Sequence, residues 1–347
     1  MHCPRLQDLP SPQACKTGWP WTEESPPVPE TMQDGSPWPK ITIITPSFNQ
    51  SAFIEETIRS VLLQGYPDIQ YMIFDGGSTD NSVDIIKKYE KWIEYWESKP
   101  DRGQSHAINK GFTKARGEIV AWINSDDFYC QNAFCTSAGW LSKEEGIYFI
   151  YGDCHVIDEE GGRIDYYKGK FYSSQDFKAY WKHYIPQPSA FFLSDVIRDV
   201  GLLDEGLDFV MDYDFWLRCS LKYFLYYTNE AIANFRIHAV SKTSAHKESF
   251  DVELDRAVRR YWGKPLSPAY WRYWFSRNRF RSGVLRWNAY KAMQQGNLKK
   301  CLEQIIKSII YYPPFFLDRK FYRRDNLKDK YLPFLSGLMF PGSKRCQ

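Results

Sequence analysis

Residues 119–128 read IVAWINSDDF, a run of five apolar residues followed by an Asn, a Ser and two adjacent aspartates. The apolar run predicts a short buried strand that ends where the polar residues begin. Adjacent carboxylates at a strand end repel each other and contribute nothing to packing. They become favourable when a divalent cation lies between them and a polyphosphate, because Mg²⁺ and Mn²⁺ prefer hard oxygen ligands. The alternative interpretation of Asp126 and Asp127 is a solvated turn without a ligand.

The segments before this strand alternate between strand and helix patterns. Strands are predicted for ITIIT at 41–45 and QYMIFD at 70–75, and helices for residues 51–64, 80–92 and 105–115. This alternation predicts a mainly parallel sheet that helices cover on both faces. In such sheets, ligands bind beyond the carboxyl ends of the strands.

Three of the predicted strands end in polar clusters. These clusters are TPSFN at 45–49, DGGSTD at 75–80 and NSDD at 124–127. Because the carboxyl ends of parallel strands meet at one edge of a sheet, we expect a single acidic, hydroxyl-rich crevice there. No GxGxxG follows the first strand and no GxxxxGK[ST] occurs, which excludes a dinucleotide fingerprint and a P-loop.

The chain divides into three regions of different character. Residues 1–38 are rich in proline and lack hydrophobic periodicity, which predicts a disordered or extended arm. Residues 39–250 form the α/β domain, and its second part, 147–237, predicts a mixed α+β arrangement with a helix at 213–222. The shorter strands expected there are IYFIYGD, SAFFL, FLYYT and IANFRI. Residues 251–347 predict a basic, aromatic-rich helical tail.

The net charge of +3 conceals an asymmetry along the chain. Residues 1–255 carry 24 Lys and Arg against 38 Asp and Glu, a net charge of −14, and residues 256–347 carry 21 against 4, a net charge of +17. The eight cysteines have no zinc-site spacing, which favours free thiols in a reducing compartment. Without a charged-then-apolar leader or a run of 18 apolar residues, the sequence predicts a cytoplasmic protein with no membrane span.

Four segments occur in this order in the first half of the domain: TPSFN, DGGSTD, DRGQSHAINKG and INSDD. Together with IPQPSAFF at 185–192, MDYDFWLR at 211–218 and NFRIHAVSKT at 234–243, they resemble the family 2 glycosyltransferases over residues 40–245. The resemblance implies the GT-A fold, an α/β fold with a Rossmann-like mixed sheet that binds a nucleoside diphospho-sugar, here with a C-terminal helical extension. The chain is similar to bacterial enzymes that build cell-surface and exported polysaccharides.

The resemblance also assigns donor and metal sites. The positions that it assigns to donor binding in the first half are Thr45, Pro46, Asp75, Asp101, Arg102, Lys110, Asn124 and Ser125. The family's metal motif Asp-x-Asp reads Asn124-Ser125-Asp126 here, so its first position departs from the pattern. Asn can hydrogen-bond a ribose hydroxyl but contributes no charge. A divalent cation, Mn²⁺ or Mg²⁺, would therefore rely on Asp126, Asp127 and His238, although a lone His is more often structural.

The catalytic base is expected in MDYD. Family members carry a Glu-Asp or similar pair opposite the donor, and here Met211 replaces the Glu and Asp212 matches the Asp. Asp212 would deprotonate the acceptor hydroxyl for a direct displacement that inverts the anomeric carbon. Burial beside Met211 and Tyr213 would raise its pKa to a useful value. The alternative for Asp212 is a helix N-terminal residue that the helix dipole stabilises.

The remaining assignments concern the leaving group and the acceptor. Arg236, Lys242 and Thr243 are candidates for contacts with the leaving diphosphate, where positive charge offsets the charge that develops. Gln187 and Ser189 are expected to shape the acceptor pocket. Asp214 and Trp216 are expected to support the site from the same helix as Asp212.

The basic tail has three interpretations. A nucleic-acid patch is disfavoured because the neighbouring domain is acidic and no nucleic-acid motif appears. A membrane-surface contact is favoured by aromatic residues such as Trp271 and Trp287 interleaved with arginines such as Arg272 and Arg286, which suit anionic lipid. The third is packing by a pair of tetratricopeptide-like helices at 287–314.

The sequence therefore predicts a metal-dependent, inverting GT-A glycosyltransferase that uses a nucleotide-sugar donor and a glycan or lipid-linked acceptor at the cytoplasmic face of a membrane. One alternative is a catalytically silent nucleotide-sugar-binding or assembly protein, which the non-acidic residues at 124 and 211 keep open. The other is a sugar-phosphate nucleotidyltransferase, which would need a Gly-rich, basic loop after the first strand where TPSFNQS stands.

Overall fold

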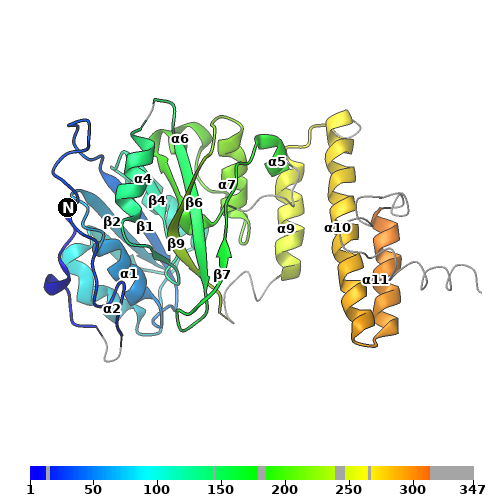
Figure 1. The fold of residues 1–347 in the computed structure, drawn as a ribbon, viewed down its shortest axis with the longest axis horizontal. Helices are drawn as coiled ribbons and strands as arrows, with labels where there is room; N and C mark the ends of the chain where they lie inside the picture. Colours follow the sequence, from blue (N-terminus) through cyan, green and yellow to red (C-terminus); the bar gives the residue numbers. More distant parts are fainter. Residues whose placement is uncertain (13–15, 144, 179–184, 239–246, 265–266, 313–347) are drawn as a thin grey trace, which may run out of the picture. The chain divides into compact units, whose positions relative to one another are not determined.

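The computed structural model describes residues 1–12, 16–143, 145–178, 185–238, 247–264 and 267–312. The chain falls into two compact units, Met1–Tyr261 and a second unit that begins at Trp262 (Figure 1). The boundary between the units lies after helix α9 (Lys247–Arg259). The boundary predicted from the sequence, at residue 250, falls within this helix.

A single mixed sheet runs through the first unit. In spatial order its strands are β3 (Tyr95–Ser98), β2 (Ile69–Asp75), β1 (Ile41–Ser47), β4 (Ile119–Trp122), β8 (Ala190–Leu193), β6 (Phe149–Ile157), β9 (Tyr226–Arg236) and β5 (Phe128–Tyr129), with β7 (Arg163–Tyr167) paired to β6. β3, β2, β1 and β4 are parallel, as predicted. β8 is antiparallel to both β4 and β6, so it joins the parallel half to the mixed half.

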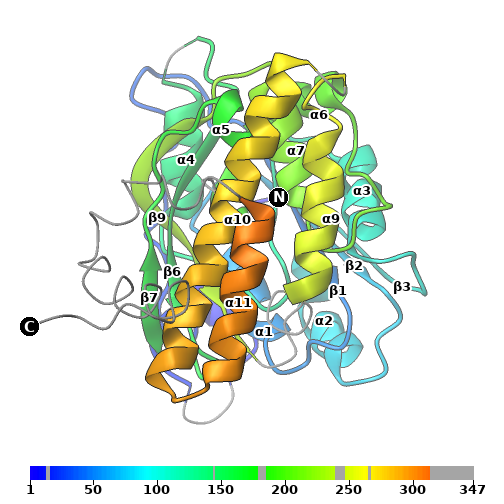
Figure 2. The same cartoon turned by 90° about the vertical axis from the view of Figure 1, so that its right-hand side faces the viewer.

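Helices cover both faces of this sheet (Figures 1 and 2). They are α1 (Ile54–Leu62), α2 (Ser82–Tyr89), α3 (Gln104–Lys114), α4 (Ala133–Leu141), α5 (Ser174–Lys178), α6 (Ser194–Val200), α7 (Met211–Ser220) and α9, with 3-10 turns at Leu6–Asp8, Glu90–Trp92 and Gln187–Ser189. Apolar residues of α1, α2 and α4 form one continuous core with the sheet. On the other face, α3 and α7 pack an aromatic cluster in which Trp122 of β4 stacks on Trp216 with ring centroids 5.0 Å apart.

Two sequence features let β1 lie at the centre of the sheet. Pro46 has no N–H to donate, and β1 pairs with β4 only as far as Ile44, so the proline lies beyond that pairing. Gly111 of α3 faces Ile44, where an added Cβ would lie 2.6 Å from the isoleucine side chain. The glycine therefore lets α3 pack closely on the strand that carries the first polar cluster.

The described residues of the Pro-rich arm are extended chain packed on the domain, which is the second of the two predicted alternatives. The guanidinium of Arg59 in α1 is fully buried and donates hydrogen bonds to the carbonyl oxygens of Pro10, Pro20 and Trp21, at 2.9 to 3.0 Å. Trp19 donates its indole N–H to the Tyr129 carbonyl at 2.7 Å. Proline-rich chain forms few hydrogen bonds of its own. Its carbonyl groups are therefore free to accept hydrogen bonds from the buried Arg59, and these bonds hold the arm on the domain.

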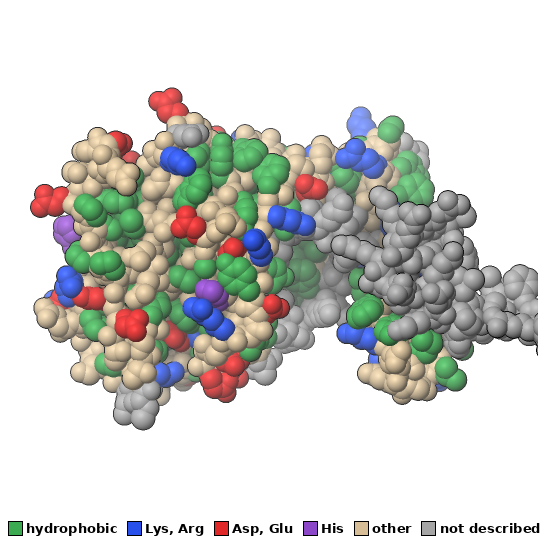
Figure 3. Space-filling view, in the orientation of Figure 1, with side chains coloured by type: hydrophobic (Ala, Val, Ile, Leu, Met, Phe, Trp, Pro, Cys, Tyr) green, Lys and Arg blue, Asp and Glu red, His purple; other side chains and the backbone are tan. Residues whose placement is uncertain are grey.

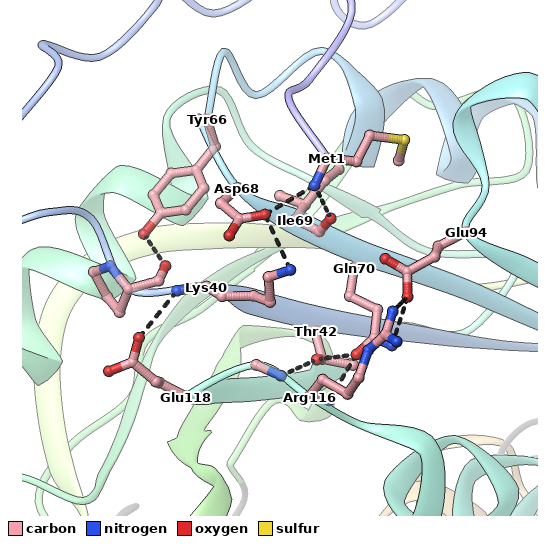
Figure 4. A network of polar contacts seen from close by, with 12 residues as sticks. Met1, Lys40, Thr42, Tyr66, Asp68, Ile69, Gln70, Glu94, Arg116 and Glu118 are labelled. Carbon is pink, nitrogen blue, oxygen red and sulfur yellow. Dashed lines mark hydrogen bonds and ion pairs between the residues drawn. The ribbon is translucent and has the colours of Figure 1, made fainter.

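A polar network connects the amino ends of β1, β2 and β4, at the edge of the sheet opposite the polar clusters (Figure 4). The Gln70 side chain accepts a hydrogen bond from Thr42 Oγ1 at 2.8 Å and donates one to Glu94 at 2.8 Å. Lys40 and the Met1 ammonium both pair with Asp68. These contacts fix the relative register of the strands.

One difference between the second half of the sheet and the sequence prediction concerns β9. FLYYT and IANFRI were expected as two strands, but residues 226–236 form the single strand β9. Its pairing with β6 shifts register around Asp153, and Asn229 has a φ of 56°. The polar residues between the two segments therefore mark an irregularity within one strand. The composition of such an irregularity is similar to that of a turn.

The second unit contains the predicted helical extension, α10 (Pro268–Gln294) and α11 (Leu298–Tyr311). A short turn with Gly296 at a φ of 72° joins them, and Ala289, Ala292, Cys301 and Ile305 form their common core. No helix among the described residues is long and apolar enough to cross a membrane. On the face of the first unit shown in Figure 3, acidic and basic side chains are interspersed, so its acidic excess does not gather into one patch there.

Candidate active site

A cavity of about 600 Å³ lies beyond the carboxyl ends of β1, β2 and β4. Its walls include residues from each of the three predicted polar clusters, namely Pro46, Gly76 and residues 124–126. The single crevice predicted from the strand ends is therefore present. The opposite wall comes from the second half of the domain and includes Gln187 and Asp212.

Asp126 lines this cavity, and His238, which does not line it, lies against Asp126. Nε2 of His238 lies 3.0 Å from Oδ2 of Asp126, which is 20% exposed, while the imidazole is almost completely buried beside the Phe53 ring. An accessible carboxylate with an imidazole against it is a donor set that suits Mn²⁺. Among the described residues, no three His, Cys, Asp or Glu side chains gather as a metal site. The residues therefore fit a cation that takes its other ligands from a bound diphosphate and water.

Asp127 points the other way. Its carboxylate is buried and accepts hydrogen bonds from the backbone N–H of Arg236 at 2.9 Å and from Nδ2 of Asn124 at 3.4 Å, and it does not line the cavity. Burial, and after it the charge of Asp126, raises the pKa of Asp127 well above its ordinary value. Asp127 therefore holds the loop from the side away from the cavity. The sequence analysis had expected it to be a metal ligand, and its position differs from that expectation.

Asn124, the departure from the family motif, has a structural explanation. Its Oδ1 accepts a hydrogen bond from Nε2 of Gln104 in α3 at 2.6 Å, and its amide nitrogen faces Asp127. An aspartate at this position would place a second negative charge against the buried Asp127 carboxylate. The neutral amide avoids that repulsion and serves both neighbours.

Arg236 connects the loop that carries Asp126, residues 124–127, to two other parts of the domain. Its guanidinium donates to the Asp126 carbonyl at 2.9 Å, to the Asp158 and Glu159 carbonyls at 3.1 and 2.8 Å, and to Glu56 Oε2 at 2.6 Å. The side chain lines the cavity but is almost completely buried. Its donors are largely used within the protein, so its charge is what it would offer to a bound diphosphate.

Asp212 lies at the second position of α7, on the cavity wall beside Met211. Burial raises the pKa of its carboxyl group from the ordinary 3.8 to about 6, while a hydrogen bond from the Tyr213 N–H at 2.7 Å opposes the shift. A carboxylate with a pKa near neutrality that faces a cavity is suited to accept a proton.

Two buried polar atoms at the cavity have no hydrogen-bond partner among the described residues, Ser47 Oγ and Gln187 Oε1. The other end of the Gln187 amide donates to the Trp122 carbonyl at 2.8 Å, which fixes the orientation of the side chain. Buried polar groups are normally paired. These two atoms are therefore available to hydroxyl groups of a ligand.

Residues 42–201 match the model of the family described as Glycosyl transferase family 2. The chain carries a family 2 glycosyltransferase domain. An uncharacterized glycosyltransferase of Rickettsia typhi is 26% identical over 219 residues, or 61% of this chain and 69% of that protein. An uncharacterized glycosyltransferase of Mycobacterium tuberculosis is 29% identical over 189 residues, or 53% of this chain and 70% of that protein.

Solved structures confirm the predicted GT-A fold. Residues 1–349 of S. aureus TarS, crystallised with UDP-GlcNAc, superpose with a TM-score of 0.57 at 16% identity, covering 88% of this chain and 93% of that one. The mannosyltransferase PcManGT from Pyrobaculum calidifontis, in complex with GDP-Man and Mn²⁺, gives a TM-score of 0.50 at 15% identity, covering 88% of each chain. At these identities the likeness concerns the fold.

In this glycosyltransferase, several expected donor residues lie away from the cavity. Thr45 is buried against the Tyr71 hydroxyl, at 3.2 Å. Arg102 pairs with Glu205 at 2.6 Å, and Lys110 pairs with Glu97 at 2.8 Å. These three side chains do not line the cavity, whereas Pro46, Asp101, Asn124 and Ser125 do.

Asp75 is also occupied within the protein. Its carboxylate accepts hydrogen bonds from the backbone N–H groups of Gly77 and Ser78 and from the hydroxyls of Ser78 and Ser98, at 2.5 to 3.1 Å. The carboxylate is almost completely buried and folds the loop whose first residue, Gly76, reaches the cavity. The structure therefore places Asp75 one layer behind the cavity wall.

The expected supporting residues of this glycosyltransferase are buried. Asp214 pairs with Arg218 at 2.9 Å, Trp216 stacks on Trp122, and the Ser189 hydroxyl donates to the Gly152 and Pro186 carbonyls. Only Gln187 of this group lines the cavity. Lys242 and Thr243 lie outside the described residues.

The cavity of this glycosyltransferase also has walls formed by residues to which the sequence analysis assigned no role. Phe48, Asp208, Phe209 and Phe250 are among them. Phe48 belongs to the TPSFN cluster and was within reach of the motif analysis. The others come from a loop and a helix without recognisable pattern, and only the fold brings them to the cavity.

Proposed function

We propose that this glycosyltransferase moves a sugar from a nucleotide-sugar donor to a hydroxyl of a glycan or lipid-linked acceptor, with inversion at the anomeric carbon. The observation that carries the proposal is that one cavity has Asp126, with His238 against it, in one wall and Asp212, with its raised pKa, in another. The first suits a cation and diphosphate, and the second suits proton transfer. Neighbours of this fold bind UDP-GlcNAc and GDP-Man.

In the proposed reaction, the ionised Asp212 accepts the proton of the acceptor hydroxyl. The acceptor oxygen forms a bond to the anomeric carbon from the face opposite the leaving group. The bond between that carbon and the phosphate oxygen breaks, and its electron pair leaves with the nucleoside diphosphate. Attack from the opposite face inverts the anomeric carbon.

Asp126 and His238 would hold a divalent cation, Mn²⁺ or Mg²⁺. When bound, such a cation offsets the charge that develops on the leaving diphosphate. Asp127 and Arg236 keep the Asp126 loop in place, and the buried positive charge of Arg236 acts in the same direction as the cation. Ser47 Oγ and Gln187 Oε1 offer hydrogen-bonding partners to sugar hydroxyls.

For the acceptor, we propose a growing surface or exported polysaccharide made at the cytoplasmic face of a membrane. Support comes from the second unit, where Trp271, Phe275 and Trp287 are 39%, 48% and 49% exposed in a basic segment of the chain. Exposed aromatics with nearby arginines favour contact with anionic lipid. The two helices of this unit also pack on each other, so the proposed contact with lipid would occur in addition to helix packing.

The deciding experiment measures turnover of a panel of nucleotide sugars with Mn²⁺, with wild-type protein and the variants Asp212→Asn and Asp214→Asn. We expect turnover of one donor, loss of transfer in Asp212→Asn with nucleotide binding retained, and substantial activity in Asp214→Asn. Absence of turnover with intact nucleotide binding would favour the catalytically silent alternative. Turnover at the wild-type rate in Asp212→Asn would remove Asp212 from the base role.

A further inference from the structure

Helix α9 follows the segment that matches the family model, yet it contacts the backbone next to Asp212. The carboxylate of Glu253 in α9 accepts hydrogen bonds from the backbone N–H groups of Asp208, Phe209 and Val210, at 2.8, 2.6 and 3.1 Å. Glu253 is 9% exposed. One buried side chain therefore serves three consecutive backbone donors.

These donors lie just before α7, which begins at Met211. The first N–H groups of a helix have no acceptor within the helix, and a side chain at the N-cap position usually supplies one. The N-cap residue here is Val210, which cannot, and no side-chain cap bond forms. Glu253 instead accepts from the N–H of Val210 and of the two residues before it, so it holds the chain that leads into α7, and its negative charge also suits the positive end of the α7 dipole.

Other residues near Glu253 hold the same segment. Arg256 donates to the Gly206 carbonyl at 2.9 Å, and Arg260 pairs with Asp204 at 2.6 Å. On the α3 side, Ser105 donates to the Leu207 carbonyl at 3.2 Å. The loop before α7 is therefore fixed by α9 and α3 together, and its residues Asp208 and Phe209 line the cavity.

We propose that Glu253 is a positioning residue for Asp212, which rests on the proposed function of Asp212 as the base. Asp212 follows the last of the three N–H groups that Glu253 binds by two residues. Its carboxylate can reach the acceptor hydroxyl only when the start of α7 is held in place. A displacement of about 1 Å at a reacting group can lower a rate by roughly 100-fold.

The test compares full-length Glu253→Ala, Glu253→Asp and Glu253→Gln with wild type, using UDP-GlcNAc and GDP-mannose with Mn²⁺ as probes. We expect kcat to fall by about 100-fold in Glu253→Ala, with the donor KM within about twofold of wild type. Glu253→Asp keeps the charge but is one methylene shorter, so it should behave like Glu253→Ala. Glu253→Gln keeps one acceptor oxygen at the same reach and should retain more activity than either.

Glu303→Gln is the matched control, because Glu303 pairs with Lys307 on the surface of α11. It should leave kcat and KM unchanged. Hydrogen exchange provides a readout that needs no substrate: Glu253→Ala should speed exchange of the amides at 208–214 and leave β1 and β4 protected. Unchanged exchange at 208–214 would overturn the inference even if neither probe is turned over.

Combination with Asp212→Asn separates this inference from the proposed function. If Glu253 acts through Asp212, adding Glu253→Ala to Asp212→Asn should not lower the residual rate further. An additional loss in the double variant, or a loss of donor binding in Glu253→Ala, would indicate a general structural role and refute positioning. Wild-type turnover in Asp212→Asn would instead refute the base assignment itself.

Discussion

Replacing Asp212 by Asn should stabilise the fold while abolishing transfer. Burial raises the pKa of Asp212 from 3.8 to about 6, so the folded protein holds this proton more tightly than the unfolded chain does. Ionising the carboxyl group in the fold at pH 7 then costs about 3 kcal/mol, from roughly 1.4 kcal/mol per pH unit. Asn is never ionised and its Oδ1 can still accept the Tyr213 N–H, so the variant avoids this cost.

The sign of the effect follows from the two pKa values. Below about pH 4 the carboxyl group is protonated in both states, so wild type and Asp212→Asn should unfold at the same temperature. As the pH rises through 4 to 6, wild type loses stability relative to the variant, and the difference should be constant above that range. The same ionisation should give the wild-type rate an acid limb near pH 6.

Thermal unfolding of both proteins between pH 4 and pH 8 measures this difference. At pH 7 the variant should melt several degrees higher. Asp214→Asn is the matched control, because Asp214 pairs with Arg218 at 2.9 Å and its neutralisation should lower the melting temperature. A difference between Asp212→Asn and wild type that is independent of pH, or a variant that is less stable at pH 7, would refute the reasoning.

Three further predictions concern the metal site, the arm and the second unit. Asp126→Ala should weaken Mn²⁺-dependent binding of UDP or GDP by roughly 10- to 100-fold in calorimetry, as expected for loss of a charged contact, and an unchanged Kd would remove Asp126 from the site. Arg59→Ala should lower the free energy of unfolding by about 3 kcal/mol and expose the arm to protease, whereas Arg198→Ala, on the surface, should change it by less than about 1 kcal/mol. Deleting residues 265–347 should shift the protein from the membrane fraction to the soluble fraction, and an unaltered distribution would leave the second unit as a packing or partner surface.

The parallel half of the fold was predictable because its signals are local. Helical spacing in α1 and α3 and the apolar runs of β1, β2 and β4 each occur within a few residues. The edge at which the polar clusters meet follows from strand direction alone. The strand β9 was divided in the prediction because a polar irregularity inside a strand has the same composition as a turn.

The directions of individual side chains were harder to predict. The Asp127 N–H donates to the Asn124 carbonyl at 3.1 Å, so residues 124–127 form a turn, and Asp126 and Asp127 leave this turn in different directions. Asp75 bonds Ser98, and Lys110 pairs with Glu97. Both partners belong to β3, a strand that was not predicted. Glu253 had no local signal, because its acceptor role depends on backbone more than 40 residues earlier in the chain.

The residues that contact the loop at 124–127 lie far from it in sequence, and this affects how the protein folds during its synthesis. Asp126 and His238 are separated by 112 residues in sequence, and Glu56 and Arg236 by 180. A nascent chain that has emerged only as far as β8 contains the carboxyl ends of β1, β2 and β4 but lacks both Arg236 and His238. Under the proposed function, nucleotide-sugar binding would begin only after β9 docks, and by mass action the donor would stabilise only the completed domain. Donor concentration in the cell would then contribute to how much of the newly made protein reaches and keeps its native state.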